Sequence, residues 1–271
     1  MLKTFLLVIL MIAITESHAQ IVSLPLARHK FVVIAHRGDH VLVPENTLAA
    51  YENGIKNSVD FVEIDLRTTK DSVLVIMHDA TVDRMTNGKG KISDLTYAEL
   101  KKLQVIDKTK GSRAIYRIPT FEEVLKTCRN KIYIYLDYKD ASVQQAYKMI
   151  KQYGMEKQII VYINTAAQYT EWRTRVPAMP LMLSLPEDVK TEAQLNKFLK
   201  ETPIDLLDGD YSDYTPVVLG AATKAGITTW PDIQGTDEDK NWNHALEMGF
   251  TGLQTDHPAE LIGYLKSKGL R

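Results

Sequence analysis

Short apolar runs with the character of β-strands alternate along this chain with segments of helical pattern. Alternation of this kind is typical of repeated βα units around a parallel sheet, because each parallel connection needs a crossover. Nine runs fit a strand: 31–35, 61–66, 73–77, 131–138, 159–163, 181–185, 204–207, 227–230 and 252–255. The chain has 271 residues, no internal repeat and no linker rich in proline or glycine. These features predict a single α/β domain, and the length suits one large α/β barrel.

Nine strands are one more than an eight-stranded barrel holds. The weakest candidates are 181–185 and 204–207, and we expect one of them to be a loop or to lie outside the barrel. Only twelve residues separate Asp65 from His78, too few for a crossover helix and a return strand. The usual helix should therefore be absent there. The stretch 80–119 is long and polar for a βα connection, and we interpret it as an insertion over the strand ends.

Several helices have recognisable ends. In a capping box, a Thr side chain and a Glu or Gln three residues later satisfy free backbone N–H groups. Four pairs fit this pattern: Thr96/Glu99, Thr120/Glu123, Thr165/Gln168 and Thr191/Gln194. Glycines that suit a left-handed helix end are Gly154, Gly226, Gly249 and Gly269. Pro258 stands where the first turn of a last helix would begin.

The N-terminus has the pattern of a signal peptide over residues 1–19. Lys3 precedes a ten-residue apolar run, 5–14, and small residues precede a cut before Gln20. Ten residues are too few to cross a bilayer, which takes roughly 20; the alternative is a buried N-terminal helix. We therefore expect an exported protein, periplasmic or secreted, with no stable membrane anchor and a single mature domain over residues 20–271.

Charge and cysteine content exclude some classes of function. The formal net charge is −1, so nothing global favours nucleic acid or an anionic membrane, and attraction for a phosphate must come from a local cluster. Apolar residues make up 45% and charged residues 25%, which is ordinary for a soluble globular protein. Cys128 is the only cysteine and lies in a helical pattern, which favours a structural thiol over a nucleophile.

Three carboxylates on two strands predict a cation site. Glu63 and Asp65 are two residues apart on a strand, so their side chains point to the same face. Like charges in a poorly solvated site repel, and a cation is the simplest compensation; the alternative is an ion-paired acidic pair at a sheet edge. Asp137 and Lys139 repeat the spacing on a later strand. Carboxylates without cysteine suit one hard divalent ion, Ca²⁺ or Mg²⁺, with Mn²⁺ as a further option.

Two histidines at different strand ends predict acid–base chemistry. His36 and His78 each follow an apolar run, and one can accept a proton near neutral pH while the other donates one. Arg37 offers a planar fork for phosphate oxygens, and Lys139 offers a point charge. His40, His244 and His257 are expected to be exposed and receive no role.

Together these fragments resemble the glycerophosphodiester phosphodiesterase family. The matches are Ala35-His36-Arg37-Gly38, Pro44-Glu45-Asn46-Thr47, Glu63-Ile64-Asp65, Thr69-Lys70-Asp71, His78-Asp79, Arg84 with Thr86-Asn87-Gly88, Leu136-Asp137-Tyr138-Lys139, and Thr255-Asp256. Each fragment is weak alone. Their common order and spacing, over about residues 31–260, make the resemblance specific.

The resemblance implies a TIM (β/α)8 barrel with a small insertion after the third strand, and a divalent metal. It also implies that metal ligands, acid–base pair and phosphate contacts lie at the carboxyl ends of the strands. By position, the ligands would be Glu63, Asp65 and Asp137, the acid–base pair His36 and His78, and the phosphate contacts Arg37 and Lys139.

Two positions depart from the family pattern. The family usually has Glu where this chain has Asp137, whose side chain is one methylene shorter. Near the seventh strand the family tends to have Trp-Thr-Val-Asn, and here the sequence is Trp230-Pro231-Asp232-Ile233. Trp230 is predicted to pack against the alcohol part of a substrate; the alternative is a core aromatic.

The predicted function is metal-dependent hydrolysis of glycerophosphodiesters, small molecules, to glycerol phosphate and an alcohol. One alternative is cleavage of a phospholipid or lysophospholipid head group, which needs an apolar surface near the rim. The insertion offers only scattered apolar residues for it, such as Val105, Ile106 and Ile115. A second alternative is a barrel that binds a phosphodiester without cleaving it.

Overall fold

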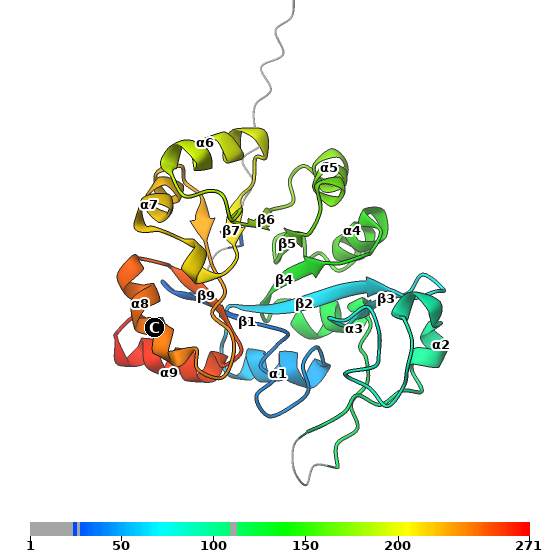
Figure 1. Ribbon diagram of the computed structural model, residues 1–271. Coiled ribbons are helices and arrows are strands. Elements are labelled where there is room, and N and C mark those ends of the chain that lie inside the picture. Colours follow the sequence, from blue (N-terminus) through cyan, green and yellow to red (C-terminus); the bar gives the residue numbers. More distant parts are fainter. Residues whose placement is uncertain (1–23, 26–27, 109–112) are drawn as a thin grey trace, which may run out of the picture.

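Eight parallel strands form one sheet that curves into a nearly closed barrel (Figure 1). They are β1 (Val32–Ala35), β2 (Phe61–Thr68), β4 (Tyr133–Tyr138), β5 (Ile159–Ile163), β6 (Leu181–Ser184), β7 (Leu206–Asp208), β8 (Thr228–Thr229) and β9 (Gly252–Thr255). The order around the barrel is β8-β7-β6-β5-β4-β2-β1-β9. A parallel bridge between Asp232, just after β8, and Gln254 on β9 brings the two ends together. The predicted (β/α)8 barrel is confirmed.

The computed structural model describes residues 24–25, 28–108 and 113–271. The predicted signal peptide, residues 1–19, lies outside them, so the export that it implies stays a prediction. Among the described helices, none combines the length and apolar character needed to cross a membrane.

Helices surround the barrel. They are α1 (Leu48–Lys56), α3 (Phe121–Cys128), α4 (Val143–Gln152), α5 (Ala166–Arg175), α6 (Glu192–Glu201), α7 (Pro216–Lys224), α8 (Asp239–Met248) and α9 (Pro258–Ser267). A short 3₁₀ turn, η2 (Tyr211–Asp213), follows β7. Predicted capping boxes are present at Thr120 and Thr165. At Thr191 only the hydroxyl half forms, because the Gln194 side chain accepts from the backbone N–H of Lys190 instead.

The ninth strand, β3 (Leu74–Ile76), is the one that lies outside the barrel. It pairs antiparallel with β2, with Ile76 opposite Leu66, and no helix connects the two strands. The expectation that 181–185 or 204–207 leaves the barrel was therefore wrong, since β6 and β7 are both barrel strands. The missing crossover helix was predicted correctly. A short apolar run has the same pattern in a parallel and an antiparallel pair, so composition could not identify the odd strand.

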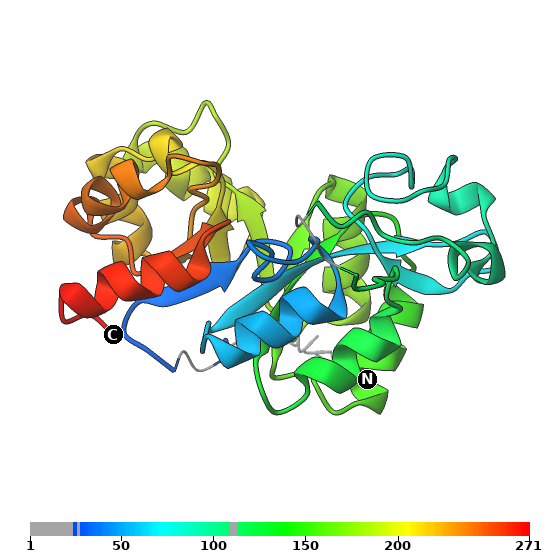
Figure 2. The ribbon, with the colours of Figure 1, turned by 90° about the horizontal axis from the view of Figure 1, so that it is seen from below.

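The insertion forms a small unit beside the carboxyl end of β2. It contains a 3₁₀ turn, η1 (Ile92–Asp94), and α2 (Tyr97–Leu100), whose N-terminus carries the predicted capping box at Thr96. Figure 2 shows it projecting from the barrel on the side away from α9. Its apolar side chains form a separate cluster together with Val75 of β3 and Met77: Val82, Met85, Ile92, Leu100, Val105 and Ile118. The insertion is thus packed and can hold residues at the rim of the barrel.

Side chains on the barrel strands alternate between two apolar layers. On β2, Val62, Ile64 and Leu66 pack in the main core, which lies between the sheet and its helices. The inward-facing layer is a smaller cluster: Val32, Ile34, Phe61, Tyr135, Ile160, Met182, Leu206 and Trp230. Glu63 and Asp65 follow Phe61 on the inward face of β2, two and four residues nearer its carboxyl end. The apolar layer therefore forms a floor, and polar groups lie above it.

Candidate active site

A cavity of about 250 Å³ lies above this floor at the carboxyl ends of the strands. Its lining comes from all sides of the barrel and is almost entirely polar: His36, Arg37, Glu63, Asp65, His78, Tyr135, Asp137, Lys139, Tyr162, Asn164, Asp208, Asp232, Gln234 and Gln254. Seven of the eight residues predicted from the sequence are in this set, and Trp230 is the exception. Segments more than 100 residues apart thus meet at one cavity.

Trp230 lies in the apolar floor. It is 4% exposed, and its ring centroid is 5.2 Å from that of Phe61. A Cβ at position 252 would come within 2.5 Å of its Cδ1, so Gly252 is needed for the indole to fit. This is the position of a core aromatic, the alternative that the sequence left open, and not that of a side chain meeting a substrate in the cavity.

The three predicted metal ligands come together. The register pairs Asp65 on β2 with Asp137 on β4, and one oxygen of each of Glu63, Asp65 and Asp137 lies within 4.8 Å of the other two. Backbone and amide donors fix the carboxylates. Arg37 N donates to Glu63 Oε2 and Asn46 Nδ2 to Asp65 Oδ2, each at 2.7 Å. Asn164 Nδ2 donates to Asp137 Oδ1, also at 2.7 Å. The trio is therefore held in place by its neighbours.

The trio carries more negative charge than the protein compensates. Burial, together with the nearby charges of Asp65 and Asp137, raises the pKa of Glu63 well above its usual value. Burial and Asp65 also raise the pKa of Asp137. Among the described residues, two cations contact the trio: Arg37 Nε lies 3.7 Å from Asp65 Oδ2, and Lys139 pairs with Asp137 and lies 3.2 Å from Asp65 Oδ1. Although burial opposes its charge, these carboxylates raise the pKa of Lys139, which therefore stays protonated.

The donor set fits a hard divalent cation. All three groups offer carboxylate oxygen, which Ca²⁺ and Mg²⁺ prefer. Asp65 is 1% exposed, and its Oδ1 is buried without a hydrogen bond. The Lys139 ammonium lies 3.2 Å from this oxygen without a hydrogen bond to it, and a bound cation would supply the coordination that it lacks. The shorter Asp137 side chain reaches the trio from β4, so the departure from the family Glu does not break up the cluster.

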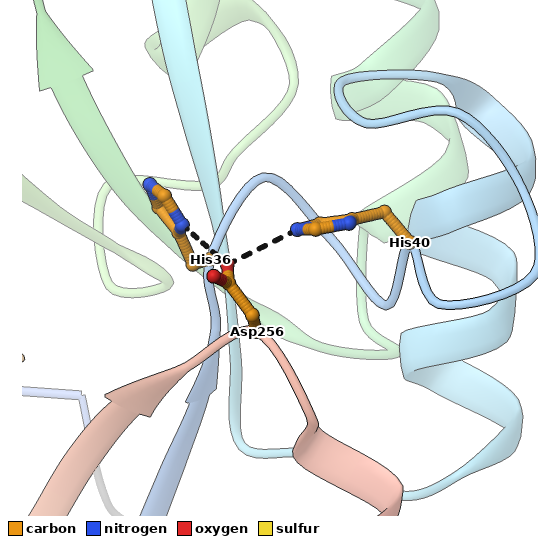
Figure 3. A group of neighbouring side chains, drawn as sticks. All are labelled: His36, His40 and Asp256. Atoms are coloured by element: carbon orange, nitrogen blue, oxygen red, sulfur yellow. Dashed lines mark hydrogen bonds and ion pairs between the residues drawn. The ribbon is translucent and has the colours of Figure 1, made fainter. Parts of the chain in front are cut away.

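His36 is oriented by the last strand. Its Nδ1 lies 2.7 Å from Asp256 Oδ1, and His40 Nε2 lies 3.2 Å from the same oxygen (Figure 3). Burial opposes the charge of Asp256, but hydrogen bonds from both histidines hold its pKa far below the usual range. An ionised Asp256 can only accept, so Nδ1 of His36 carries the proton and Nε2, on the far side of the ring, is left to exchange one.

His78 has a similar partner within a larger ionic network. Its Nδ1 lies 2.8 Å from Asp79 Oδ1. Arg84 holds Asp79 and also bonds both oxygens of Glu45, which accepts in turn from Arg37. Although burial works against it, the Arg84 hydrogen bonds keep the pKa of Asp79 below its usual range. The predicted phosphate contact Arg37 and the predicted catalytic His78 are thus fixed by one chain of charges.

Sequence reasoning did not assign roles to several of these partners. His40 was expected to be exposed without a role, yet it bonds Asp256; His244 is exposed as expected. Asp256, Glu45 and Asn46 all stand inside motifs that carried the family resemblance. Those motifs were therefore a signal for the positioning groups. Asn164 had no such signal, because single amides after a strand are common. Gln254 lies on β9, next to the Thr255-Asp256 motif that carried the resemblance, but it was assigned no role.

Comparisons with known proteins agree with the geometry. Residues 36–260 match the model of the glycerophosphoryl diester phosphodiesterase family. The chain belongs to this family. Its sequence is 31% identical over 247 residues to a glycerophosphodiester phosphodiesterase of Caldanaerobacter subterraneus subsp. tengcongensis, covering 89% of this chain and 100% of the relative. The resemblance seen in the sequence is confirmed, and the protein is an enzyme of the phosphoric diester hydrolase class.

Solved structures share the fold of this phosphodiesterase. A glycerophosphoryl diester phosphodiesterase from Parabacteroides distasonis is 25% identical, with a TM-score of 0.75 and 90% of each chain covered. A phosphodiesterase from Oleispira antarctica, solved in complex with the product sn-glycerol-3-phosphate, is 20% identical, with a TM-score of 0.77 over 87% of this chain and 96% of that one. Because the chain belongs to a family of enzymes, the alternative of a barrel that binds a phosphodiester without cleaving it is no longer supported.

Proposed function

We propose that this phosphodiesterase hydrolyses glycerophosphodiesters to glycerol phosphate and an alcohol, with a divalent cation and a pair of histidines. The observation that carries the proposal is the single cavity in which the trio Glu63, Asp65 and Asp137 meets both His36 and His78. The names of the relatives and the product bound to the Oleispira antarctica enzyme support the substrate class.

The residues of the chain divide the work. The trio would hold the cation, which when bound neutralises phosphate oxygens and so eases attack on phosphorus. Arg37 and Lys139 line the same cavity and would bind the remaining phosphate oxygens. Each histidine has a carboxylate at Nδ1, so each would exchange its proton at Nε2. One would take the proton of the nucleophile, and the other would protonate the departing alkoxide.

Removal and return of metal ions tests the proposal. With a chelator, hydrolysis of sn-glycero-3-phosphocholine should fall to background, and Ca²⁺, Mg²⁺ or Mn²⁺ should restore it, because the uncompensated trio repels the phosphate. Rates are measured by release of glycerol phosphate, with direct titration of each ion into the apoprotein by calorimetry. Full turnover in chelator would refute metal dependence. Absence of turnover on a panel of glycerophosphodiesters with every ion would refute the substrate class.

A specific surface feature favours a second candidate, cleavage of a lysophospholipid head group. A groove of about 390 Å³ shares its polar residues His40 and Glu45 with the ionic contacts of the site. Asp107 and Lys108 also line it, and the rest of its lining is apolar: Val41, Leu42, Val43, Pro44, Met85 and Ile106. Leu42 is 71% exposed and Ile106 is 42% exposed. Such a groove could receive an acyl chain. Comparing glycerophosphocholine with its monoacylated parent separates the two candidates, and faster turnover of the acylated compound would favour the second.

Asp256 acts as a positioning residue in this scheme. In Asp256→Asn, the amide can donate to His36 and so select the wrong tautomer, as in other carboxylate–histidine pairs. We expect kcat to fall by about 10- to 100-fold with KM little changed, since the group does not line the cavity. Asp256→Glu should recover part of the rate. The control is Asp239→Asn, an exposed carboxylate in the first turn of α8. If Asp256→Asn and Asp256→Glu lost kcat to the same extent, and both also lost thermal stability, Asp256 would instead have a structural role.

A further inference from the structure

A second acidic group lies in the cavity, on the wall opposite the trio. Asp208 ends β7, Asp232 follows β8 and Gln254 belongs to β9, whereas the trio stands on β2 and β4, across the barrel in strand order. All three side chains line the cavity. None of them has a part in the hydrolysis as described above. We call Asp208, Asp232 and Gln254 the acid–amide wall.

The carboxyl groups of Asp208 and Asp232 lie close enough for each to perturb the pKa of the other. Tyr135 donates its hydroxyl to Asp208, and the side-chain amide N–H of Gln254 donates to Asp232. Burial raises the pKa of Asp208 well above its usual value and that of Asp232 to about 7. The pair is therefore close to neutral, or carries about one negative charge, near neutral pH.

The wall leaves two buried oxygens without hydrogen-bond partners. Gln254 is 4% exposed, and its Oε1 is buried with no hydrogen bond. Asp208 is 2% exposed, and its Oδ1 is buried with no hydrogen-bond partner. Such buried oxygens are costly unless a ligand in the cavity satisfies them. Such a ligand needs groups that can both donate and accept, because a protonated Asp208 has an O–H to donate while the Gln254 oxygen needs a donor.

We infer that the acid–amide wall binds the two free hydroxyl groups of the glycerol part of the substrate, and so selects polyol phosphodiesters. The inference rests on the proposed function, because it concerns the organic part of the same substrate. Two hydroxyl groups provide two hydrogen-bond partners for the oxygens of Asp208 and Gln254. Each hydroxyl can also accept a hydrogen bond, and Tyr162, on the same lining, carries a hydroxyl that lies 2.7 Å from Ser184 Oγ. With phosphate at the trio, the glycerol would extend toward the wall.

Two phosphate esters test the inference directly. sn-Glycerol 3-phosphate and n-propyl phosphate share the phosphate and the three-carbon chain and differ by two hydroxyl groups. Their dissociation constants for the wild-type protein are measured by calorimetry, in the presence of the cation that the metal titration identifies. We expect sn-glycerol 3-phosphate to bind about 30- to 100-fold more tightly, about tenfold or less for each hydrogen-bonded hydroxyl.

Variants of the acid–amide wall test which residues cause the difference in affinity between the two esters. Gln254→Met keeps the length of the side chain without its polar atoms, and Asp208→Leu keeps the branched shape without its oxygens. In each variant, sn-glycerol 3-phosphate should bind no more than about fivefold more tightly than n-propyl phosphate. The affinity for n-propyl phosphate should stay similar to that of the wild type. The matched control is Gln158→Met. Gln158 precedes β5 at the other end of the barrel, and within the described part of the chain its side chain bonds backbone groups of Asn130 and Ile132, so the wild-type ratio of the two affinities should persist.

The outcomes separate this inference from the proposed function. Equal binding of the two esters by the wild type overturns the inference, even if a wall variant fails to fold, and leaves phosphate binding intact. A wild-type ratio in both wall variants overturns it as well. Tighter binding of 3-aminopropyl phosphate than of sn-glycerol 3-phosphate would show recognition of an ammonium group instead. Failure of every ester to bind would contradict the proposed function itself.

Discussion

Asp65→Asn is expected to lower kcat/KM for a glycerophosphodiester by about a thousandfold, equivalent to about 4 kcal/mol of transition-state stabilisation. The substitution keeps the shape of the side chain and an oxygen that can accept from Asn46. It removes the charge from the carboxylate whose Oδ1 has no hydrogen bond and lies 3.2 Å from Lys139 Nζ. The loss should therefore come from weaker cation binding and not from a damaged fold.

Two measurements separate these causes. In calorimetric titration, the variant should bind the cation at least about tenfold more weakly than the wild type. Without metal, it should unfold at the same temperature or a higher one, because a buried like charge has been removed. Asp188→Asn is the control, since Asp188 is an exposed carboxylate after β6. If Asp65→Asn retained wild-type cation affinity and lost no more than about tenfold in rate, the trio would not be the metal site.

The sequence was sufficient to predict those site residues whose position follows from the alternation of side chains along a strand. Glu63 and Asp65 share a face because side chains alternate, and Asp137 joins them because β2 and β4 are neighbours in register. The same local logic gave the capping box at Thr120 and the helix start at Pro258. These features depend on a few consecutive residues, or on two strands whose polar ends were visible in the sequence.

The sequence was insufficient where the outcome depends on which strands become neighbours. β3 was assigned a place beside the other strands because an apolar run does not show its direction. Trp230 was predicted to contact the substrate because the sequence does not show how deep in the barrel a residue near a strand end lies. Its place in the apolar floor is evident only when the inward-facing side chains of all the strands are seen together. The contact between His36 and Asp256 joins residues 220 positions apart through the pairing of β1 with β9. The acid–amide wall likewise needed the register of three strands.

His36→Ala and His78→Ala are each expected to lower kcat/KM by about 10²- to 10⁴-fold while the barrel stays folded. Neither imidazole belongs to an apolar cluster of the core, and the side chains are 15% and 38% exposed. Removing either leaves the trio and its amide donors in place, so cation binding should persist. The control is His244→Ala, an exposed histidine on α8 outside the cavity.

The pH dependence of these variants would also assign the two roles. With one histidine acting as base and the other as acid, kcat/KM of the wild type should fall at both low and high pH. The variant that has lost the base should no longer show the fall at low pH, and the variant that has lost the acid should no longer show the fall at high pH. Because the two act in one reaction, the double variant should lose little more than the worse single variant. Near-wild-type rates in both single variants would contradict acid–base catalysis by this pair and would leave the cation, Arg37 and Lys139 as the whole of the catalytic apparatus.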